Sequence, residues 1–139
     1  MGVKLSTESI RYIALFESLT GAIVKDCLIY DDRVVFLVRK GDMGLAIGKG
    51  GINVEKAREI IGKKVEIFEH SDNPAEFIEN VFRPIKVTVK IVERGDKKIA
   101  YVYASSQYKG LIIGKGGKNI NKVKELVRRH HDIEDVIVK

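Results

Sequence analysis

The sequence predicts an α+β protein that contains two copies of one αββααβ domain. The first observation is an internal repeat: GLAIGKGGINVEKAREII at positions 44–61 recurs 66 positions later as GLIIGKGGKNINKVKELV at 110–127, with ten of 18 residues identical. A period of this length indicates two copies of a small domain rather than a short solenoid repeat. The second observation is that helical and alternating apolar patterns follow in the same order in both halves.

Length and composition fit this division. A chain of 139 residues, 45% apolar and 32% charged, is long enough for one average domain or two minimal ones. We expect domains at 1–71 and 72–139. Cores of this size are marginal, and a linker of about five residues reaches at most ~3.5 Å per residue. The two domains are therefore expected to be closely packed, with a very short linker.

The first half predicts six elements in order. Ser6 or Thr7 can cap a helix that ends at Gly21. The helix that follows the glycine loop is expected to direct Val54, Ala57, Ile60 and Ile61 toward the core. Gly62 ends this helix. The remaining elements are strands at 27–30 and 33–39 around an Asp31-Asp32 turn, a short helix at 43–47, a glycine loop at 48–51 and a closing strand at 64–69.

The second half repeats this order. Asp72 or Asn73 can cap a helix that has Pro74 in its first turn and Phe77, Ile78 and Val81 directed inward. Residues 85–91 alternate as a half-buried strand, and a turn at 94–97 leads to a strand at 99–104. A short helix, a loop at 114–117, a helix with Ile120, Val123, Leu126 and Val127 inward, and a strand at 135–139 complete the pattern.

The two glycine loops are the candidate functional sites. Two helices joined by four residues need a turn that β-carbons would obstruct, and glycine permits this turn. The absence of side chains also lets a phosphodiester approach the unpaired N–H groups at the start of the next helix, where Lys49 or Lys115 adds a charge. The alternative is that the glycines serve only the turn. A lysine in both loops, which a turn does not need, favours phosphate binding.

Two other phosphate-binding motifs do not fit. A Walker-type loop needs four residues between its first glycine and Gly-Lys, followed by Ser or Thr. Here Gly44 and Gly48 enclose three residues, and Gly50 follows the lysine. A dinucleotide fingerprint needs glycine where Asn53 and Asn119 stand. A nucleotide-hydrolysing enzyme is therefore disfavoured.

The charge distribution points to a polyanionic partner. The net charge is +6, and residues 71–139 hold 14 Lys/Arg against nine Asp/Glu, whereas residues 1–70 hold 11 against ten. Such a basic half attracts nucleic acid first and anionic membranes second. No apolar run approaches the roughly 18–20 residues of a membrane span, and the single Cys27 permits no internal disulfide. We expect a cytoplasmic protein with no membrane association.

Catalytic and metal-binding patterns are not recognised in the sequence. His130 and His131 are neighbours on a helix and diverge by about 100°, and no metal-ligand spacing is present. Asp31-Asp32 fits turn chemistry better than a carboxylate pair. We therefore expect a non-enzyme without metal, cofactor or small-molecule substrate.

The loops resemble a known family. Residues 47–54 (IGKGGINV) and 113–120 (IGKGGKNI) resemble the Ile-Gly-x-x-Gly-x-x-Ile signature of KH domains, whose loop clamps about four nucleotides of single-stranded RNA. The αββααβ order is similar to type II KH domains. With residues 80–84 (NVFRP) between them, the two domains resemble the KH pair of NusA-like transcription termination/antitermination factors. The resemblance favours the short archaeal form, with the KH pair alone.

This resemblance implies a single-stranded RNA-binding protein of transcription termination or antitermination, with RNA polymerase or its elongation complex as a candidate partner. The alternative is a KH component of a ribosomal or RNA-processing assembly. By family analogy, the RNA contacts would be Ile47, Gly48, Lys49, Gly50, Gly51, Ile52, Asn53 and Lys56 in the first domain, and Ile113, Gly114, Lys115, Gly116, Gly117, Lys118, Asn119 and Lys122 in the second. Strands 64–67 and 136–138 would form the facing walls. Val54 and Ile120 fit core positions better than a base-contacting floor.

Two further expectations concern the second half. Lys118, Lys122 and Arg129 share roughly one helix face, so this domain should supply most of the salt-dependent attraction, unless the charges form only a solvated surface. Because Lys118 replaces Ile52, the two grooves should read different bases. Tyr101, Tyr103 and Tyr108 could stack bases, but the first two share a strand face and are expected in the core.

Overall fold

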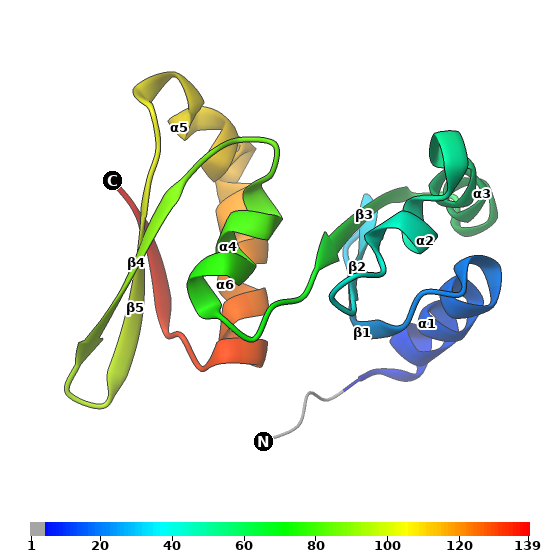
Figure 1. Ribbon diagram of the computed structural model, residues 1–139, viewed down its shortest axis with the longest axis horizontal. Helices are drawn as coiled ribbons and strands as arrows, with labels where there is room; N and C mark the ends of the chain where they lie inside the picture. The colour runs from blue at the N-terminus through cyan, green and yellow to red at the C-terminus, as the bar shows by residue number, and fades with distance from the viewer. Residues whose placement is uncertain (1–4) are drawn as a thin grey trace. The chain divides into compact units, whose positions relative to one another are not determined.

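The computed structural model describes residues 5–139, which divide into two compact units between His70 and Ser71. Each unit contains a helix, two strands, two helices and a strand, with a short 3-10 turn between the second and third helices (Figure 1). The predicted α+β class and αββααβ order are therefore confirmed. The boundary expected from the sequence, between residues 71 and 72, lies one residue after the observed one.

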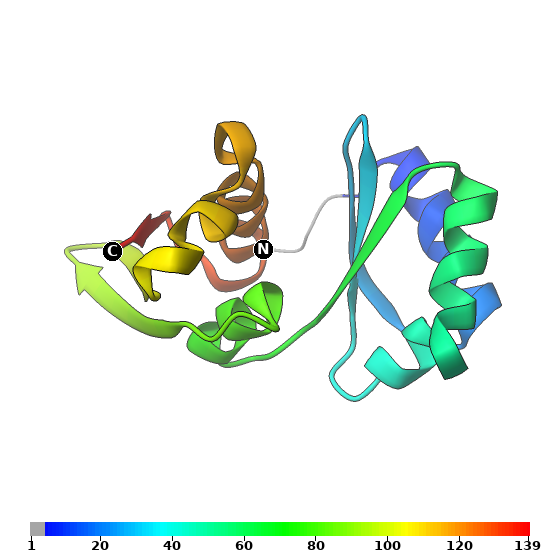
Figure 2. The ribbon, with the colours of Figure 1, turned by 90° about the horizontal axis from the view of Figure 1, so that it is seen from above.

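The first unit has a three-stranded mixed sheet. Its elements are α1 (Thr7–Thr20), β1 (Val24–Ile29), β2 (Arg33–Val38), α2 (Met43–Ile47), η1 (Lys49–Gly51), α3 (Ile52–Ile61) and β3 (Lys64–Glu69). The central strand β2 pairs antiparallel with β1 and parallel with β3. The helices lie on one side of this sheet (Figure 2). Because the strand order is β1-β2-β3, β3 is an edge strand.

Helix ends and core packing in this unit follow from local chemistry. Ser6 caps α1 by accepting a hydrogen bond from the backbone N of Ser9 at 3.0 Å, and Gly21 ends the helix with φ 79°. The rings of Phe16 and Phe36 stack with centroids 4.2 Å apart, and both side chains are fully buried. Burying each ring contributes roughly 1.5–3 kcal/mol, so this pair fixes α1 against the sheet.

The second unit repeats the arrangement. Its elements are α4 (Pro74–Phe82), β4 (Thr88–Arg94), β5 (Lys97–Tyr103), α5 (Ser106–Ile113), η2 (Lys115–Gly117), α6 (Lys118–His131) and β6 (Asp135–Val138). The central strand β5 is antiparallel to β4 and parallel to β6. Asn73 caps α4 by accepting a hydrogen bond from the N of Glu76 at 3.0 Å. Helices α4 and α6 pack together, with the Phe77 and His131 rings edge to face at 4.8 Å.

Three expectations, one about a strand boundary and two about buried side chains, differ from the structure. Strand β4 begins at Thr88, three residues later than expected. Ile60 is 58% exposed, because at about 100° per residue Val54 and Ile61 lie on one side of buried Ala57, whereas Ile60 lies about 60° to the other side. Tyr103 is 42% exposed rather than part of the core, which is formed from the alternate strand positions.

Candidate nucleic-acid interface

The two glycine loops have nearly the same backbone conformation. Gly48 and Gly114 both have φ 77°, with ψ 166° and 165°, and Gly50 and Gly116 both have φ 65°, with ψ 17° and 19°. Positive φ is unfavourable for residues with a β-carbon. The repeated glycines are therefore explained by the turn, which both units form in the same way.

The first and third positions of the loop differ in what surrounds them. A β-carbon on Gly48 would lie 2.7 Å from Cγ and 3.0 Å from the backbone N of Asn53, and one on Gly114 would lie 2.9 Å from the backbone N of Asn119. A β-carbon on Gly50 or Gly116 would meet no atom within 4 Å. The protein's own packing thus requires the first glycine, whereas the third borders open space.

Asparagine side chains tie the two helices of each loop together. Asn53 Nδ2 donates to the carbonyl oxygen of Leu45 at 2.8 Å, and Asn119 Nδ2 donates to that of Leu111 at 2.7 Å. This bond links the helix after the loop to the helix before it. Both asparagines were expected among the RNA contacts, and this structural role was not predicted, although both copies keep an asparagine eight positions after a leucine.

The corner of each loop, which is Lys49 and Gly50 in the first unit and Lys115 and Gly116 in the second, faces solvent with backbone hydrogen-bond donors available. Lys49, Gly50, Lys115 and Gly116 are exposed. Because the first N–H groups of a helical turn have no carbonyl partner within it, those of Lys49 and Gly50 remain available to an external acceptor. Helix α3 starts at the same corner and directs the positive end of its dipole there. The second unit repeats this arrangement, so both corners can hold an anionic group such as a phosphate.

Exposed apolar side chains flank each corner. Ile47 and Ile52 are 39% and 51% exposed, and Ile113 is 40% exposed. Leu45 at 49% and Leu111 at 61% extend this apolar surface. These leucines were not among the predicted site residues, although the Gly-Leu pair is identical in the two copies. Apolar side chains kept in water beside donor groups are typical of a ligand-binding surface.

Core side chains lie beneath each loop, and an edge strand lies in each sheet. Ile120 is 8% exposed, and Val54 packs against the core of the first unit. Strand β3 pairs only with β2, and β6 pairs only with β5, so each leaves one row of backbone groups unpaired within its sheet. Helix α2 packs against β3. An edge strand therefore borders the loop helix in the first unit.

The lysines predicted to contact RNA fall into two groups. Lys49, Lys56 and Lys115 are exposed and Lys118 is half-buried, but Lys122 is only 5% exposed. The structure thus contradicts the expectation that Lys122 presents a surface charge. Helix α6 is covered by both the sheet and α4, so its buried surface is wider than the single apolar face visible in the sequence.

His131, at the end of α6, is partly buried and forms a structural hydrogen bond. His131 Nε2 donates to the carbonyl oxygen of Ser71 at 2.8 Å, and burial lowers the pKa of His131. Within residues 5–139, no three His, Cys, Asp or Glu side chains come together as a possible metal site. None of the helices described has the length and apolar character to cross a bilayer.

Several known proteins are similar to this chain in sequence or in fold. The profile of the KH domain matches residues 10–97 and 85–139. The probable transcription termination protein NusA of Methanocaldococcus jannaschii is 39% identical over 137 residues, covering 98% of this chain and 75% of that protein. The protein of the same name from Halobacterium salinarum is 40% identical over 136 residues, covering 98% of both chains. The crystal structure of APE1850 matches with a TM-score of 0.83 and 33% identity, covering 97% of this chain and 100% of that one.

Proposed function

Because the chain belongs to the KH domain family, in the archaeal NusA-like form with two KH domains in tandem, we propose that it is an RNA-binding protein of transcription termination. The relatives that match nearly the whole chain are named as probable transcription termination proteins, and RNA binding is inferred from the KH domains. Their coverage favours transcription over the alternative of a ribosomal or RNA-processing component.

The finer proposal is that both glycine loops hold the backbone of single-stranded RNA. The observation that carries it is the pair of exposed corners with the same backbone conformation and with no side chain at their third position. A phosphate can approach the N–H groups there, and Lys49 or Lys115 adds attraction without needing a fixed geometry. The function requires an exposed corner, and a corner covered by the protein would have excluded it.

Base contacts in this proposal come from the surfaces beside the corner. Unstacked bases can lie on the apolar side chains of Ile47 and Ile52, while the unpaired backbone groups of β3 read base edges. A duplex keeps its base faces stacked, so this arrangement favours single strands. In the second domain Lys118 stands at the position of Ile52, so we infer that the two domains prefer different bases.

The partner in the cell is inferred to be RNA polymerase or its elongation complex. The full-length protein carrying an affinity tag should therefore co-purify with polymerase subunits after nuclease treatment, which removes bridging RNA. Recovery with ribosomal particles and without polymerase would instead support the ribosomal alternative and contradict the transcription role.

The loop proposal is tested by charge reversal at the corners. Lys49→Asp with Gly50→Asp, the equivalent pair Lys115→Asp with Gly116→Asp, and all four together should progressively weaken binding of a fluorescent 12-nucleotide (CA)6 RNA in anisotropy titrations. The (CA)6 strand cannot pair with itself. Circular dichroism checks that each variant is folded, which we expect because a side chain at either third glycine meets no atom within 4 Å.

A matched control separates charge from position. Gly21→Asp with Lys25→Asp changes the same charges at another exposed glycine of positive φ, 79°, also with no atom within 4 Å of an added β-carbon. This control should bind RNA nearly as the parent does. Equal weakening by the control and by either loop variant, or a folded four-residue loop variant that binds as well as the parent, would refute the role of the loops.

A further inference from the structure

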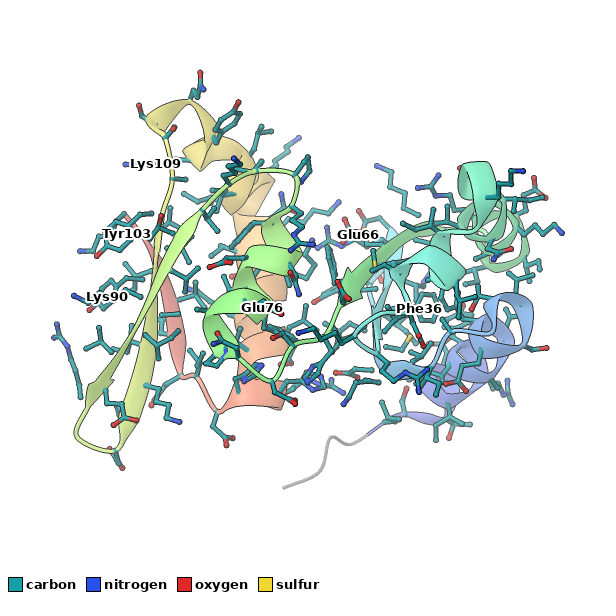
Figure 3. All side chains as sticks on the ribbon, viewed as in Figure 1. Phe36, Glu66, Glu76, Lys90, Tyr103 and Lys109 are labelled. Atoms are coloured by element: carbon teal, nitrogen blue, oxygen red, sulfur yellow. The ribbon has the colours of Figure 1, made fainter. Side chains whose placement is uncertain are left out.

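The sheet of the second unit has an open face opposite its helices. Directly paired strand residues project to the same face of a sheet, and Lys90 pairs with Tyr101 while Thr88 pairs with Tyr103. The alternate residues Ala100 and Val102 are fully buried on the other face. Figure 3 shows Lys90 and Tyr103 on the side of β4 and β5 that faces away from α4 and α6. We call Lys90, Arg94, Tyr101, Tyr103 and Lys139 the open-face cluster.

This cluster combines aromatic rings with positive charge. Tyr103 is 42% exposed, and Lys139 Nζ lies 5.3 Å from the centroid of the half-buried Tyr101 ring. Two acidic side chains at the start of β6 are engaged elsewhere. Asp135 lies 3.2 Å from Lys124 Nζ, and Glu134 lies 3.6 Å from Lys97 Nζ. Among the residues described, no carboxylate lies within ion-pair distance of Lys90, so its charge is available to a ligand.

The first unit provides an internal comparison. The 66-residue offset of the repeat aligns Val35 with Tyr101 and Leu37 with Tyr103, and Leu28 pairs with Val35 as Lys90 pairs with Tyr101. In the first unit these three positions are all apolar. The fold itself therefore does not require tyrosine and lysine on this face. Only the second copy carries an aromatic and basic surface there.

We propose that the open-face cluster is a second RNA-contact surface, separate from the glycine loops. Bases of a single strand stack on Tyr103 and Tyr101, and Lys90, Arg94 and Lys139 neutralise the phosphates that follow. Every base has a π face, so such stacking tolerates many sequences, and a positive surface tracks the backbone. The occupant is inferred from charge complementarity and from the pairing of rings with cations. The proposal goes beyond the loop function because it uses no loop residue.

The first test removes the ring or the charge from the cluster in the full-length chain. Tyr103→Thr should weaken binding of the (CA)6 RNA about tenfold, whereas Tyr103→Phe, which keeps the ring, should bind as the parent does. Threonine suits an exposed strand position, and circular dichroism confirms folding. Lys90→Gln should reduce the slope of log affinity against log salt by about 0.7. The control Lys98→Gln, on the opposite face of β5, should leave the slope unchanged.

The second test repeats these substitutions in the protein whose four loop residues are already changed to aspartate. Residual RNA binding should persist in that background and be lost on adding Tyr103→Thr. If Tyr103→Thr has no effect in either background, the open-face proposal is wrong, while the loop function is judged by its own variants. Loop variants without effect, combined with a large effect of Tyr103→Thr, would refute the loops and support the open face.

A direct readout does not depend on substitution. With ring-¹³C-labelled tyrosine, the NMR signals of Tyr101 and Tyr103 should move on adding (CA)6 RNA, while those of Tyr12 and Tyr30 in the first unit should not. Signals of Tyr101 and Tyr103 that stay fixed with saturating RNA would overturn the proposal. So would signals that move only when RNA polymerase is added, because the face would then be a protein-docking surface.

Discussion

Replacing Gly48 with alanine should destabilise the first KH domain more than replacing Gly50, although both residues lie in one loop with positive φ. At Gly50 the conformation, φ 65° and ψ 17°, is left-handed helical, and an added β-carbon meets no atom within 4 Å. The cost there is only backbone strain, about 1–2 kcal/mol. The glycine loop should therefore remain folded in the Gly50→Ala variant.

At Gly48 the backbone strain is of a different kind, and the loss of a hydrogen bond adds to it. Its conformation, φ 77° and ψ 166°, lies in a region that is essentially restricted to glycine and costs about 1–3 kcal/mol. The β-carbon would also displace the Asn53 side chain, which it would approach to 2.7 Å, so the 2.8 Å hydrogen bond to Leu45 would be lost at about 0.5–1.5 kcal/mol. The total for Gly48→Ala is about 2–4 kcal/mol, a large part of the ~5–15 kcal/mol that stabilises a typical domain.

Urea unfolding followed by circular dichroism measures these differences, and the second domain offers a repeat of the experiment with Gly114 and Gly116. Gly110→Ala is the matched control, because Gly110 lies inside α5 with no atom within 4 Å of an added β-carbon. It should stabilise the protein by about 0.4–1 kcal/mol. If Gly48→Ala costs no more than Gly50→Ala, the close approach of Gly48 to Asn53 does not determine the glycine, and the reasoning fails.

Three further predictions follow from the same structure. Lys49→Gln and Lys115→Gln should each reduce the salt slope of RNA affinity by about 0.7, measured by anisotropy titrations between 50 and about 300 mM salt; an unchanged slope in both would contradict their phosphate contacts. Asn119→Ala removes the hydrogen bond to Leu111 and should lower the free energy of unfolding by about 1 kcal/mol, so a urea midpoint equal to the parent's would show that the bond is dispensable. Burial lowers the pKa of His131 below its usual 6.5, so its contribution to stability is complete above pH 6.5 and is lost as the pH falls through the folded-state pKa. Urea midpoints from pH 8 to 5 should therefore decline less in His131→Gln than in the parent, and parallel curves would exclude this histidine as a source of the pH dependence.

Much of the fold could be predicted because the same local signals occur twice. The repeat located both loops, and the expected short helix at 43–47 coincides with α2. The inward residues of α6 could be identified because Ile120, Val123 and Leu126 recur at helical spacing, and all three are buried. Local patterns of this kind depend only on the neighbouring residues of the chain, so one sequence is sufficient to find them.

Features that depend on what covers an element could not be predicted in this way. Lys122 is buried on a helix that packs against α4 as well as the sheet, and Ile60 is exposed because only one side of α3 contacts the core. Tyr103 shares its strand with core residues, and apolar content alone does not reveal which face of a sheet stays open. The role of Asn53 depends on a bond that spans a turn, between groups eight residues apart.

The hydrogen bond from Asn53 to Leu45 has a consequence for binding thermodynamics. This bond and the backbone bonds of the turn hold the two loop helices together, so we expect that a strand that docks there does not have to order the loop. The entropic penalty of association should therefore arise mainly from the RNA, and calorimetry with a chemically stiffened oligonucleotide should show the gain. A substitution that removes the Asn53–Leu45 hydrogen bond should increase the share of the entropic penalty that comes from ordering the protein.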